Sequence, residues 1–213
     1  MTDALWISLM CGLGLLAGCV LNRLIARYRQ CGVRTRWRYP LVVTAAALGS
    51  GSVALYCPPG LLAMALALCV WLLIALIAID IDQMLLPDVL TLPLLWLGLL
   101  TNLHGALVPL SDAVLGAVVG YLFLWLLYWG FRLAIGKEGL GYGDFKLLAA
   151  LGAWCGWQRL PMLLLVAALA GMLIFLLLRL SGRAGRGEPL PFGPCLALSG
   201  WWTLVMPLAA TAT

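Results

Sequence analysis

Long apolar runs, separated by short polar or glycine- and proline-rich segments, extend along the whole chain. None of the runs alternates with period two, which excludes the strands of a transmembrane β-barrel. Helices are the other structure that satisfies every backbone group in lipid, and a helix of about 20 residues crosses a ~30 Å hydrocarbon core. The pattern predicts an all-α, polytopic membrane helix bundle with about eight transmembrane helices, at residues 4–22, 41–56, 61–79, 88–103, 112–135, 144–157, 160–179 and 193–210.

The composition is that of a membrane protein. Of the 213 residues, 64% are hydrophobic and 10% are charged, whereas soluble domains carry about 25% charged residues. The mean hydropathy is +1.07. The first apolar run has no basic segment before it, so we expect a membrane span there and not a cleaved signal peptide. We predict a single integral-membrane domain over residues 1–213.

The basic residues predict the orientation of the bundle through the positive-inside rule. Of the 13 lysines and arginines, 12 lie in or beside the loops that follow the first, fifth and seventh spans, and 1, Arg159, falls on the other side. These loops are expected to face the cytoplasm, with both termini on the outer side. The first of them is a short basic loop over residues 23–40. Because topology explains most of the net charge of +5, no nucleic-acid partner is predicted.

The seven cysteines and the single histidine, His104, show no metal-binding pattern. No two cysteines form a CxxC pair, and most lie in or beside apolar runs, where cysteine acts as a small apolar residue. Neither a zinc site nor a disulfide framework is predicted.

Small residues recur at the spacing that lets membrane helices approach closely. Such GxxxG pairs are common in membrane helices, so we assign them to packing within the bundle. The three pairs are Gly14/Gly18, Gly116/Gly120 and Gly152/Gly156.

Four of the eight acidic residues, Asp80, Asp82, Asp88 and Asp144, lie at predicted helix ends on the cytoplasmic side. Acids at membrane depth are costly and usually functional. Three of them also have a structural explanation. Asp88 follows Pro87 and could cap the next helix, Asp82 could be a solvated loop residue, and Asp144 could cap its own helix.

A glycine-rich loop, "GLGYG", precedes Asp144 and contains Gly141, Tyr142 and Gly143. A cap does not require such a loop, whereas glycines permit positive φ and close backbone approach. At about 1.5 Å per residue, the helix from Asp144 to Trp157 spans ~20 Å, which is less than the ~30 Å core. We therefore expect Asp144 to lie below the cytoplasmic surface, in a water-filled pocket inside the inner leaflet.

Two carboxylates that face each other can share a proton, so that one activates water while the other donates to a carbonyl oxygen. The partner of Asp144 must come from another cytoplasmic helix end. Asp80 is the natural choice because it still lies within the third apolar run, whereas Asp82 lies further into the loop.

These residues resemble the signatures of a known family. "GYGDFKLLAALGAWCGW" resembles the GxGD motif of the type 4 prepilin peptidases, aspartic membrane proteases that cleave the leaders of prepilins and pseudopilins. "DIDQMLLPDVLTLPLLWLGLL" resembles their other signature, in which an Asp stands seven residues before a Pro-Asp or Pro-Asn pair, as Asp80 does before Pro87 and Asp88. "GCVLNRLIARY", "RYPLV" and "LPFGPCLALSG" resemble further blocks, so the similarity covers nearly the whole chain. The GxGD core alone is less specific, because presenilin-type proteases share it.

The chain departs from the family pattern after the first span. Typical bacterial members have a long cytoplasmic loop there, with two CxxC pairs thought to bind zinc, and they also N-methylate the new pilin terminus. Here the loop over 23–40 holds only Cys31, and Val43 stands where a Glu usually follows the "RYPLV" block. The resemblance therefore implies no zinc, and it implies S-adenosylmethionine only if methyltransferase activity is retained.

The resemblance implies an inner-membrane endopeptidase with periplasmic termini. Its active site faces the cytoplasm, its substrates are prepilins or pseudopilins, and Asp80 and Asp144 are catalytic, without a metal or another cofactor. Gly141, Tyr142, Gly143, Pro87 and Asp88 are predicted to bind substrate or to shape the site. A proton- or ion-coupled transporter that uses the same carboxylates is the main alternative, and a non-catalytic assembly subunit is a third. The outer half of the chain offers few polar residues for an ion path, and an assembly subunit would leave the paired acids unexplained.

Overall fold

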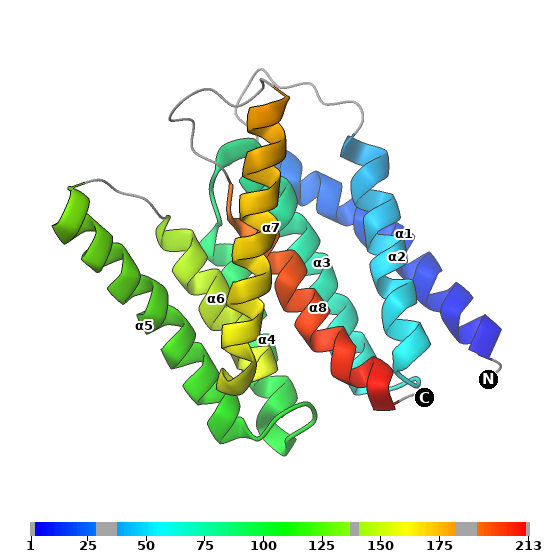
Figure 1. The fold of residues 1–213 in the computed structure, drawn as a ribbon. Helices are drawn as coiled ribbons and strands as arrows, with labels where there is room; N and C mark the ends of the chain where they lie inside the picture. Colours follow the sequence, from blue (N-terminus) through cyan, green and yellow to red (C-terminus); the bar gives the residue numbers. More distant parts are fainter. Residues whose placement is uncertain (1–2, 29–37, 137–140, 182–190, 212–213) are drawn as a thin grey trace.

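The computed structural model describes residues 3–28, 38–136, 141–181 and 191–211. Within these residues the chain forms eight α-helices and two short 3-10 helices, and no strand (Figure 1). The helices are α1 (Asp3–Arg27), α2 (Arg38–Tyr56), α3 (Leu61–Gln83), α4 (Asp88–Thr101), η1 (Asn102–His104), α5 (Leu110–Ile135), α6 (Tyr142–Cys155), η2 (Trp157–Arg159), α7 (Leu160–Leu180) and α8 (Gly193–Thr211).

The predicted all-α class is confirmed, and each of the eight predicted runs corresponds to one α-helix. The largest difference lies in the first connection. Because α1 continues to Arg27 and α2 begins at Arg38, helix takes up both ends of the basic loop expected over 23–40. Residues 29–37 of that loop lie outside the described residues.

Five segments in the described part of the chain are long and apolar enough to cross a membrane. They are α1, α2, α3, most of α5, and the segment Trp157–Leu180 that contains α7. By contrast, α4 and α6 have 14 residues each, which corresponds to about 21 Å. These two helices are too short to cross a ~30 Å hydrocarbon core.

Successive helices run in opposite directions, so their ends gather at two ends of the bundle (Figure 1). The first and last described residues lie at one end. Arg27 and Arg38 lie at the opposite end, together with Arg132 and Arg179 in the last turns of α5 and α7. We call this the basic end. It is also where α3 ends and where α4, α6 and α8 begin.

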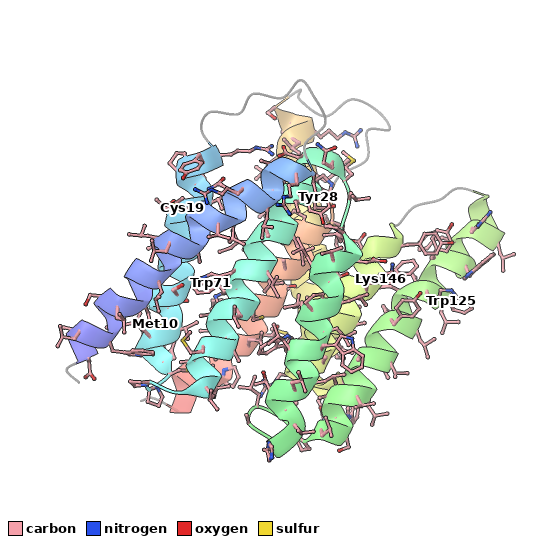
Figure 2. The ribbon with its side chains drawn as sticks, turned by 180° about the vertical axis from the view of Figure 1, so that it is seen from behind. Met10, Cys19, Tyr28, Trp71, Trp125 and Lys146 are labelled. Atoms are coloured by element: carbon pink, nitrogen blue, oxygen red, sulfur yellow. The ribbon has the colours of Figure 1, made fainter. Side chains whose placement is uncertain are left out.

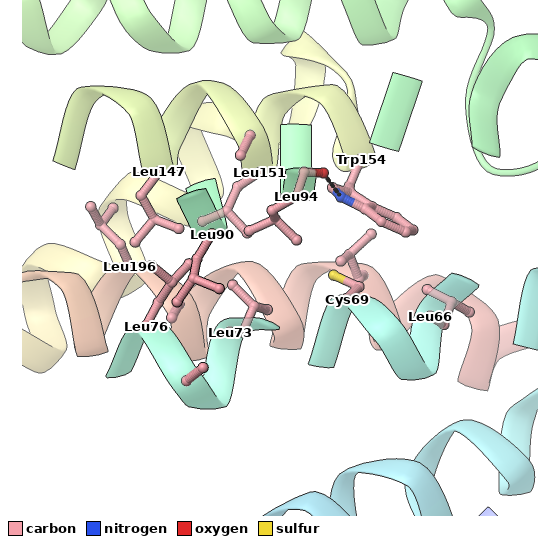
Figure 3. Packing of buried hydrophobic residues seen from close by; sticks show 14 of the residues in the cluster. Leu66, Cys69, Leu73, Leu76, Leu90, Leu94, Leu147, Leu151, Trp154 and Leu196 are labelled. Atoms are coloured by element: carbon pink, nitrogen blue, oxygen red, sulfur yellow. Dashed lines mark hydrogen bonds between the residues drawn. The ribbon is translucent and has the colours of Figure 1, made fainter. Parts of the chain in front are cut away.

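The short helix α6 forms the centre of the bundle and contacts α4, α5 and α8. All of its residues from Asp144 to Cys155 are buried except Lys146. Leu147 and Leu151 pack among leucines of α3, α4 and α8, including Leu76 and Leu196 (Figure 3). This explains how a helix too short to cross the core is accommodated, because protein surrounds it in place of lipid.

The outer helices expose many large apolar side chains. Trp125 projects outward from α5, whereas Met10 of α1 is fully buried (Figure 2). Lipid tails are as apolar as leucine, so such a surface suits a bilayer and helix association depends on close packing.

Glycines provide that close packing, as the GxxxG pattern predicts. A Cβ on Gly116 of α5 or on Gly152 of α6 would collide with the backbone of the other residue. Gly14 and Gly18 approach the α2 backbone in the same way, and Gly120 approaches the carbonyl of Leu148. The packing prediction is confirmed for these five glycines. The sixth, Gly156, ends α6 with a φ of 77°, and its backbone also approaches α5, because its carbonyl carbon would lie 2.9 Å from a Cβ on Gly116.

A buried asparagine joins three segments in the half of the bundle opposite the basic end. Asn102 is fully buried, and its Nδ2 donates to the carbonyls of Ala153 and Trp154, at 3.0 Å and 3.4 Å. Its Oδ1 accepts the N–H groups of Leu107 and Val108, at 3.0 Å and 3.1 Å. One side chain thus satisfies backbone groups at the end of α6 and in the loop before α5.

Asn102→Ala is expected to lower the free energy of unfolding by about 2 kcal/mol, because it leaves buried N–H and carbonyl groups without partners. Thr101→Ala is the matched control, since the Thr101 hydroxyl bonds only within its own helix, to Leu97 at 2.7 Å. Denaturation in mixed detergent micelles measures both changes. Equal effects of the two variants would contradict this role of Asn102.

Candidate active site

At the basic end, the end of α3 lies together with the starts of α4, α6 and α8, and α3 and α6 carry buried aspartates there. Asp80 lies in the last turn of α3 and Asp144 in the first turn of α6. The two residues are only 5% and 8% exposed. Leu86 lies next to both sites, because a Cβ on Gly143, the neighbour of Asp144, would meet Leu86, and a Cβ on Gly193 would meet both Leu86 and Asp80. The fold therefore brings together the two acids that the sequence analysis paired.

The turn after Asp80 is set by Met84. Its N–H donates to the Asp80 carbonyl at 2.8 Å, and its φ is 51°. Few residues other than glycine adopt this left-handed conformation, which commonly ends a helix. The turn leads the chain back toward the bundle, so that Leu86 is buried beside the aspartates.

Asp144 does not occupy the N-cap position of α6. It is the third residue of the helix, and Gly141 occupies the N-cap position. The carbonyl of Gly141 accepts the N–H of Asp144 at 3.2 Å. The capping role that the sequence left open for Asp144 is therefore wrong.

Two of the glycines before Asp144, Gly141 and Gly143, do not adopt positive φ, so that part of the prediction is wrong for them. Gly141 is extended, with a φ of −81°, and Gly143 lies within α6. Gly143 is needed for close approach, because a Cβ there would lie 2.7 Å from the Cβ of Leu86. Gly139, the first glycine of the loop, lies outside the described residues.

A contact that the sequence analysis did not single out reaches Asp80 from α8. The backbone N–H of Gly193 donates to Oδ2 of Asp80 at 3.1 Å. The only sequence signal is the glycine within "PFGP", part of the block "LPFGPCLALSG" near the C-terminus. Pattern alone could not pair residues that lie so far apart in the chain.

Asp82 points away from Asp80 and does not belong to this pair. It lies in the last turn of α3 and forms an ion pair with Arg38 at the start of α2. Two residues along a helix turn through about 200°, which places Asp80 toward α8 and Asp82 toward α2. Its side chain is 9% exposed, so the interpretation of Asp82 as a solvated loop residue is wrong.

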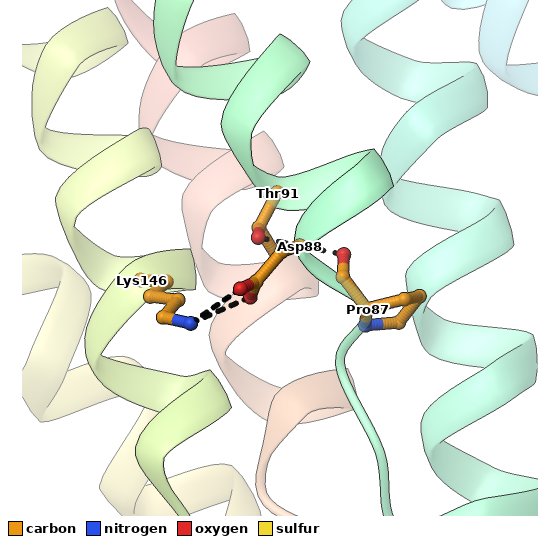
Figure 4. Close-up of polar contacts among 4 residues, drawn as sticks. All are labelled: Pro87, Asp88, Thr91 and Lys146. Atoms are coloured by element: carbon orange, nitrogen blue, oxygen red, sulfur yellow. Dashed lines mark hydrogen bonds and ion pairs between the residues drawn. The ribbon is translucent and has the colours of Figure 1, made fainter.

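Asp88 also has a partner, and it is not a cap. The N-cap position of α4 belongs to Pro87, whose carbonyl accepts the N–H groups of Leu90 and Thr91. Both Asp88 oxygens accept from Nζ of Lys146, at 2.6 Å and 2.7 Å (Figure 4). The Asp88 side chain is 54% exposed, so this ion pair joins α4 to α6 at the surface.

Tyr142 packs toward α5. Its ring lies 5.1 Å from that of Tyr128 and 5.4 Å from that of Phe145, measured between centroids. The aromatic contacts fix the first turn of α6, and with it the backbone that carries Asp144. Among the residues predicted to shape the site, Gly143 is the one in close contact with Leu86. Leu86 in turn lies beside both aspartates.

The site offers carboxylate chemistry. Two buried carboxylates in a region of low dielectric can hold one proton between them, and this pair can activate water and protonate a carbonyl oxygen. Across the described ranges, no group of three His, Cys, Asp or Glu side chains could hold a metal ion. Cys31 is not among the described residues.

Comparison with known proteins gives a family and close relatives. Residues 66–176, which include both aspartates, match the type IV leader peptidase family. A protein of Aeromonas salmonicida named prepilin leader peptidase/N-methyltransferase is 55% identical over 179 residues, which cover 84% of this chain and 62% of that protein. No solved structure matches the chain.

Other proteins with the same printed name are similar over the same share of the chain. The one from Dickeya chrysanthemi is 53% identical, over 84% of this chain and 64% of its own length. The one from Pseudomonas aeruginosa is 52% identical, over 83% and 61%. This chain thus spans somewhat less than two thirds of the length of the relatives it matches.

Proposed function

The chain belongs to the type IV leader peptidase family, and from this premise we propose that it is a membrane aspartic endopeptidase that removes the leaders of prepilins or pseudopilins. The observation that carries the proposal is the meeting of two buried aspartates, Asp80 and Asp144, within the region that matches the family. A transporter that uses the same acids is not favoured, because the matching family and the named relatives are peptidases.

In the proposed reaction one carboxylate takes a proton from water, and the water oxygen attacks the scissile carbonyl carbon. The other carboxyl donates its proton to the carbonyl oxygen, which gives a tetrahedral intermediate. As the C–N bond breaks, a proton passes from the pair to the leaving amine. Two carboxyl groups and one water therefore suffice, and the proposed reaction needs no metal or cofactor.

We further propose that the eight helices lie in the bacterial inner membrane, with both termini in the periplasm. The arginines at the helix ends support this orientation, because Arg27, Arg38, Arg132 and Arg179 gather at one end. The two aspartates lie at the same end. Cleavage would then occur at the cytoplasmic boundary of the apolar helix of the substrate.

The names of the relatives also include N-methyltransferase. That activity would transfer a methyl group from S-adenosylmethionine to the new N-terminus. Val43, which stands where the family pattern has Glu, packs against Gly18 of α1. We therefore assign the aspartates to peptide cleavage and no residue to methyl transfer.

The proposal is tested by incubating detergent-purified protein, produced in a host that lacks other prepilin peptidases, with a purified prepilin. The expected result is a single cut, which mass spectrometry of the product locates at the end of the leader. An intact prepilin after long incubation, with the enzyme still folded, would contradict the proposed activity.

Gly143→Val is expected to reduce the rate of this cleavage about 100-fold, because a displacement of about 1 Å at a catalytic group costs that much. The new Cβ would lie 2.7 Å from the Cβ of Leu86, so the first turn of α6 must move and carry Asp144 with it. Gly130→Val is the control, since a Cβ at Gly130 meets nothing within 4 Å. A normal initial rate for Gly143→Val would show that this contact does not position Asp144.

A further inference from the structure

We propose that Gly193, the first residue of α8, is a positioning residue that holds Asp80 through its backbone N–H at an approach that only glycine allows. The inference rests on the proposed peptidase function and extends it to α8, a helix that lies outside the region matched by the family. It also assigns different roles to the two oxygens of Asp80.

The contact is both polar and tight. The Gly193 N–H donates to Oδ2 of Asp80 at 3.1 Å, and both residues are buried. A Cβ on Gly193 would lie 2.5 Å from Oδ2 and 3.0 Å from Cγ of Asp80. Any other residue at this position would therefore push the carboxylate away or displace the start of α8.

The donor itself is fixed by the first turn of α8. The carbonyl of Phe192 accepts the N–H groups of Cys195 and Leu196, each at 3.1 Å. Pro194 follows Gly193, and a proline in the first turn of a helix has its φ set in advance. The carbonyl of the Phe192–Gly193 peptide is thus held by the first turn of α8, so the N–H of the same peptide can orient the carboxylate.

Leu86 connects this contact to the other aspartate. A Cβ on Gly193 would lie 3.3 Å from Leu86 Cδ2, and a Cβ on Gly143 would lie 2.7 Å from Leu86 Cβ. The starts of α6 and α8 therefore rest on one buried side chain. Leu86 acts as a spacer between the helix that carries Asp144 and the residue that holds Asp80.

The geometry assigns the anchoring role to Oδ2 of Asp80 and leaves Oδ1 for proton transfer with water or the scissile carbonyl. A carboxylate held by one oxygen keeps a fixed orientation during the reaction, and such orientation is worth a large factor in rate. Loss of the anchor should therefore lower kcat, whereas the substrate helix should bind as before.

The first test is Gly193→Ala in the full-length protein, with Gly171→Ala as the matched control. Gly171 of α7 lies beside the start of α8, but a Cβ there would meet Phe192 at 3.6 Å and Cys195 at 3.8 Å, which are ordinary contacts. We expect Gly193→Ala to lower kcat for a prepilin about 100-fold with KM changed less than about threefold. Gly171→Ala should keep both constants.

A second variant removes the hydrogen bond without adding an atom to the side chain. Cell-free synthesis can place glycolic acid at position 193, which replaces the N–H with an ester oxygen. We expect a loss in kcat of about tenfold, because one hydrogen bond is worth about that factor. An ester also weakens the helix that contains it, so the same replacement at position 171 is the control for that effect. Thermal unfolding of each variant in detergent shows whether it is folded.

A third measurement does not depend on cleavage. Isotope-edited infrared spectra of protein with ¹³C-labelled aspartate should contain a carboxyl band that is absent in Asp80→Asn. That band should shift in the position-193 ester and stay in place in the position-171 ester. An unshifted band would overturn the contact, whether or not the protein cleaves a prepilin.

The outcomes separate the inference from the proposed function. If the unmodified protein cleaves a prepilin and both Gly193 variants keep its kcat, the positioning role is wrong and the peptidase function stands. If the unmodified protein cleaves no prepilin, the peptidase function fails, and the infrared band alone decides whether Gly193 holds Asp80.

Discussion

Asp80→Asn and Asp144→Asn are each expected to reduce the rate of prepilin cleavage by a factor of about 10³, within the range that general acid–base groups contribute. An amide cannot take a proton from water at neutral pH, and it cannot return one to the leaving amine. Both residues are buried at helix ends, and their helices, α3 and α6, both pack against α4 and α8. Because Asn is nearly the same size as Asp, the bundle should remain folded.

Asp88→Asn is the matched control for these variants. It makes the same chemical change at the same end of the bundle, but Asp88 is half exposed and bonds to Lys146. Exposed ion pairs contribute about 0–1 kcal/mol, so Asp88→Asn should keep stability and most of the cleavage rate. Initial rates over a range of prepilin concentrations give the comparison. A wild-type rate in either Asp80→Asn or Asp144→Asn would remove that residue from the mechanism.

Gly116→Val is expected to have the largest effect on folding, with a loss of about 3 kcal/mol in the free energy of unfolding, the upper part of the usual range for overpacking. The backbones of Gly116 in α5 and Gly152 in α6 touch, and a Cβ on either residue would collide with the carbonyl of the other. Backbone atoms cannot move aside as a flexible side chain can. The two helices must therefore separate, which opens the contact that encloses α6.

Gly130→Val provides the comparison on the same helix, because its Cβ would meet nothing within 4 Å. Both variants lose one glycine and gain the same side chain, so their difference isolates the helix contact. Unfolding in mixed detergent micelles, followed by circular dichroism, measures it. Equal stabilities would contradict the role of the glycine contact in holding α6.

The sequence predicts the helices well because a helix in a bilayer requires a long apolar run, and turn-forming residues mark where each run ends. Each of the eight predicted runs corresponds to a helix, and the spacing of the three glycine pairs by itself indicates close helix packing. The two aspartates could also be paired, since each lies at the end of an apolar run on the basic side. These are local signals that need no knowledge of which helices are neighbours.

The remaining features depend on partners that are distant in the chain. The Asp82–Arg38 and Asp88–Lys146 pairs join different helices, so sequence spacing could not show that these acids have partners. The same holds for Gly193 and Asp80, which lie 113 residues apart. The sequence correctly indicates that Gly143 needs to be a glycine. The physical reason is its close contact with Leu86 and not a positive φ.

The most direct test of the account is the cleavage rate of the double variant Asp80→Asn/Asp144→Asn, compared with both single variants under single-turnover conditions with excess enzyme. Residues that act as one catalytic unit are strongly non-additive. We therefore predict that the double variant cleaves a prepilin at nearly the same residual rate as each single variant, about 10³-fold below the unmodified protein. If the two losses multiply, the aspartates act independently, and the account of a shared pair is wrong.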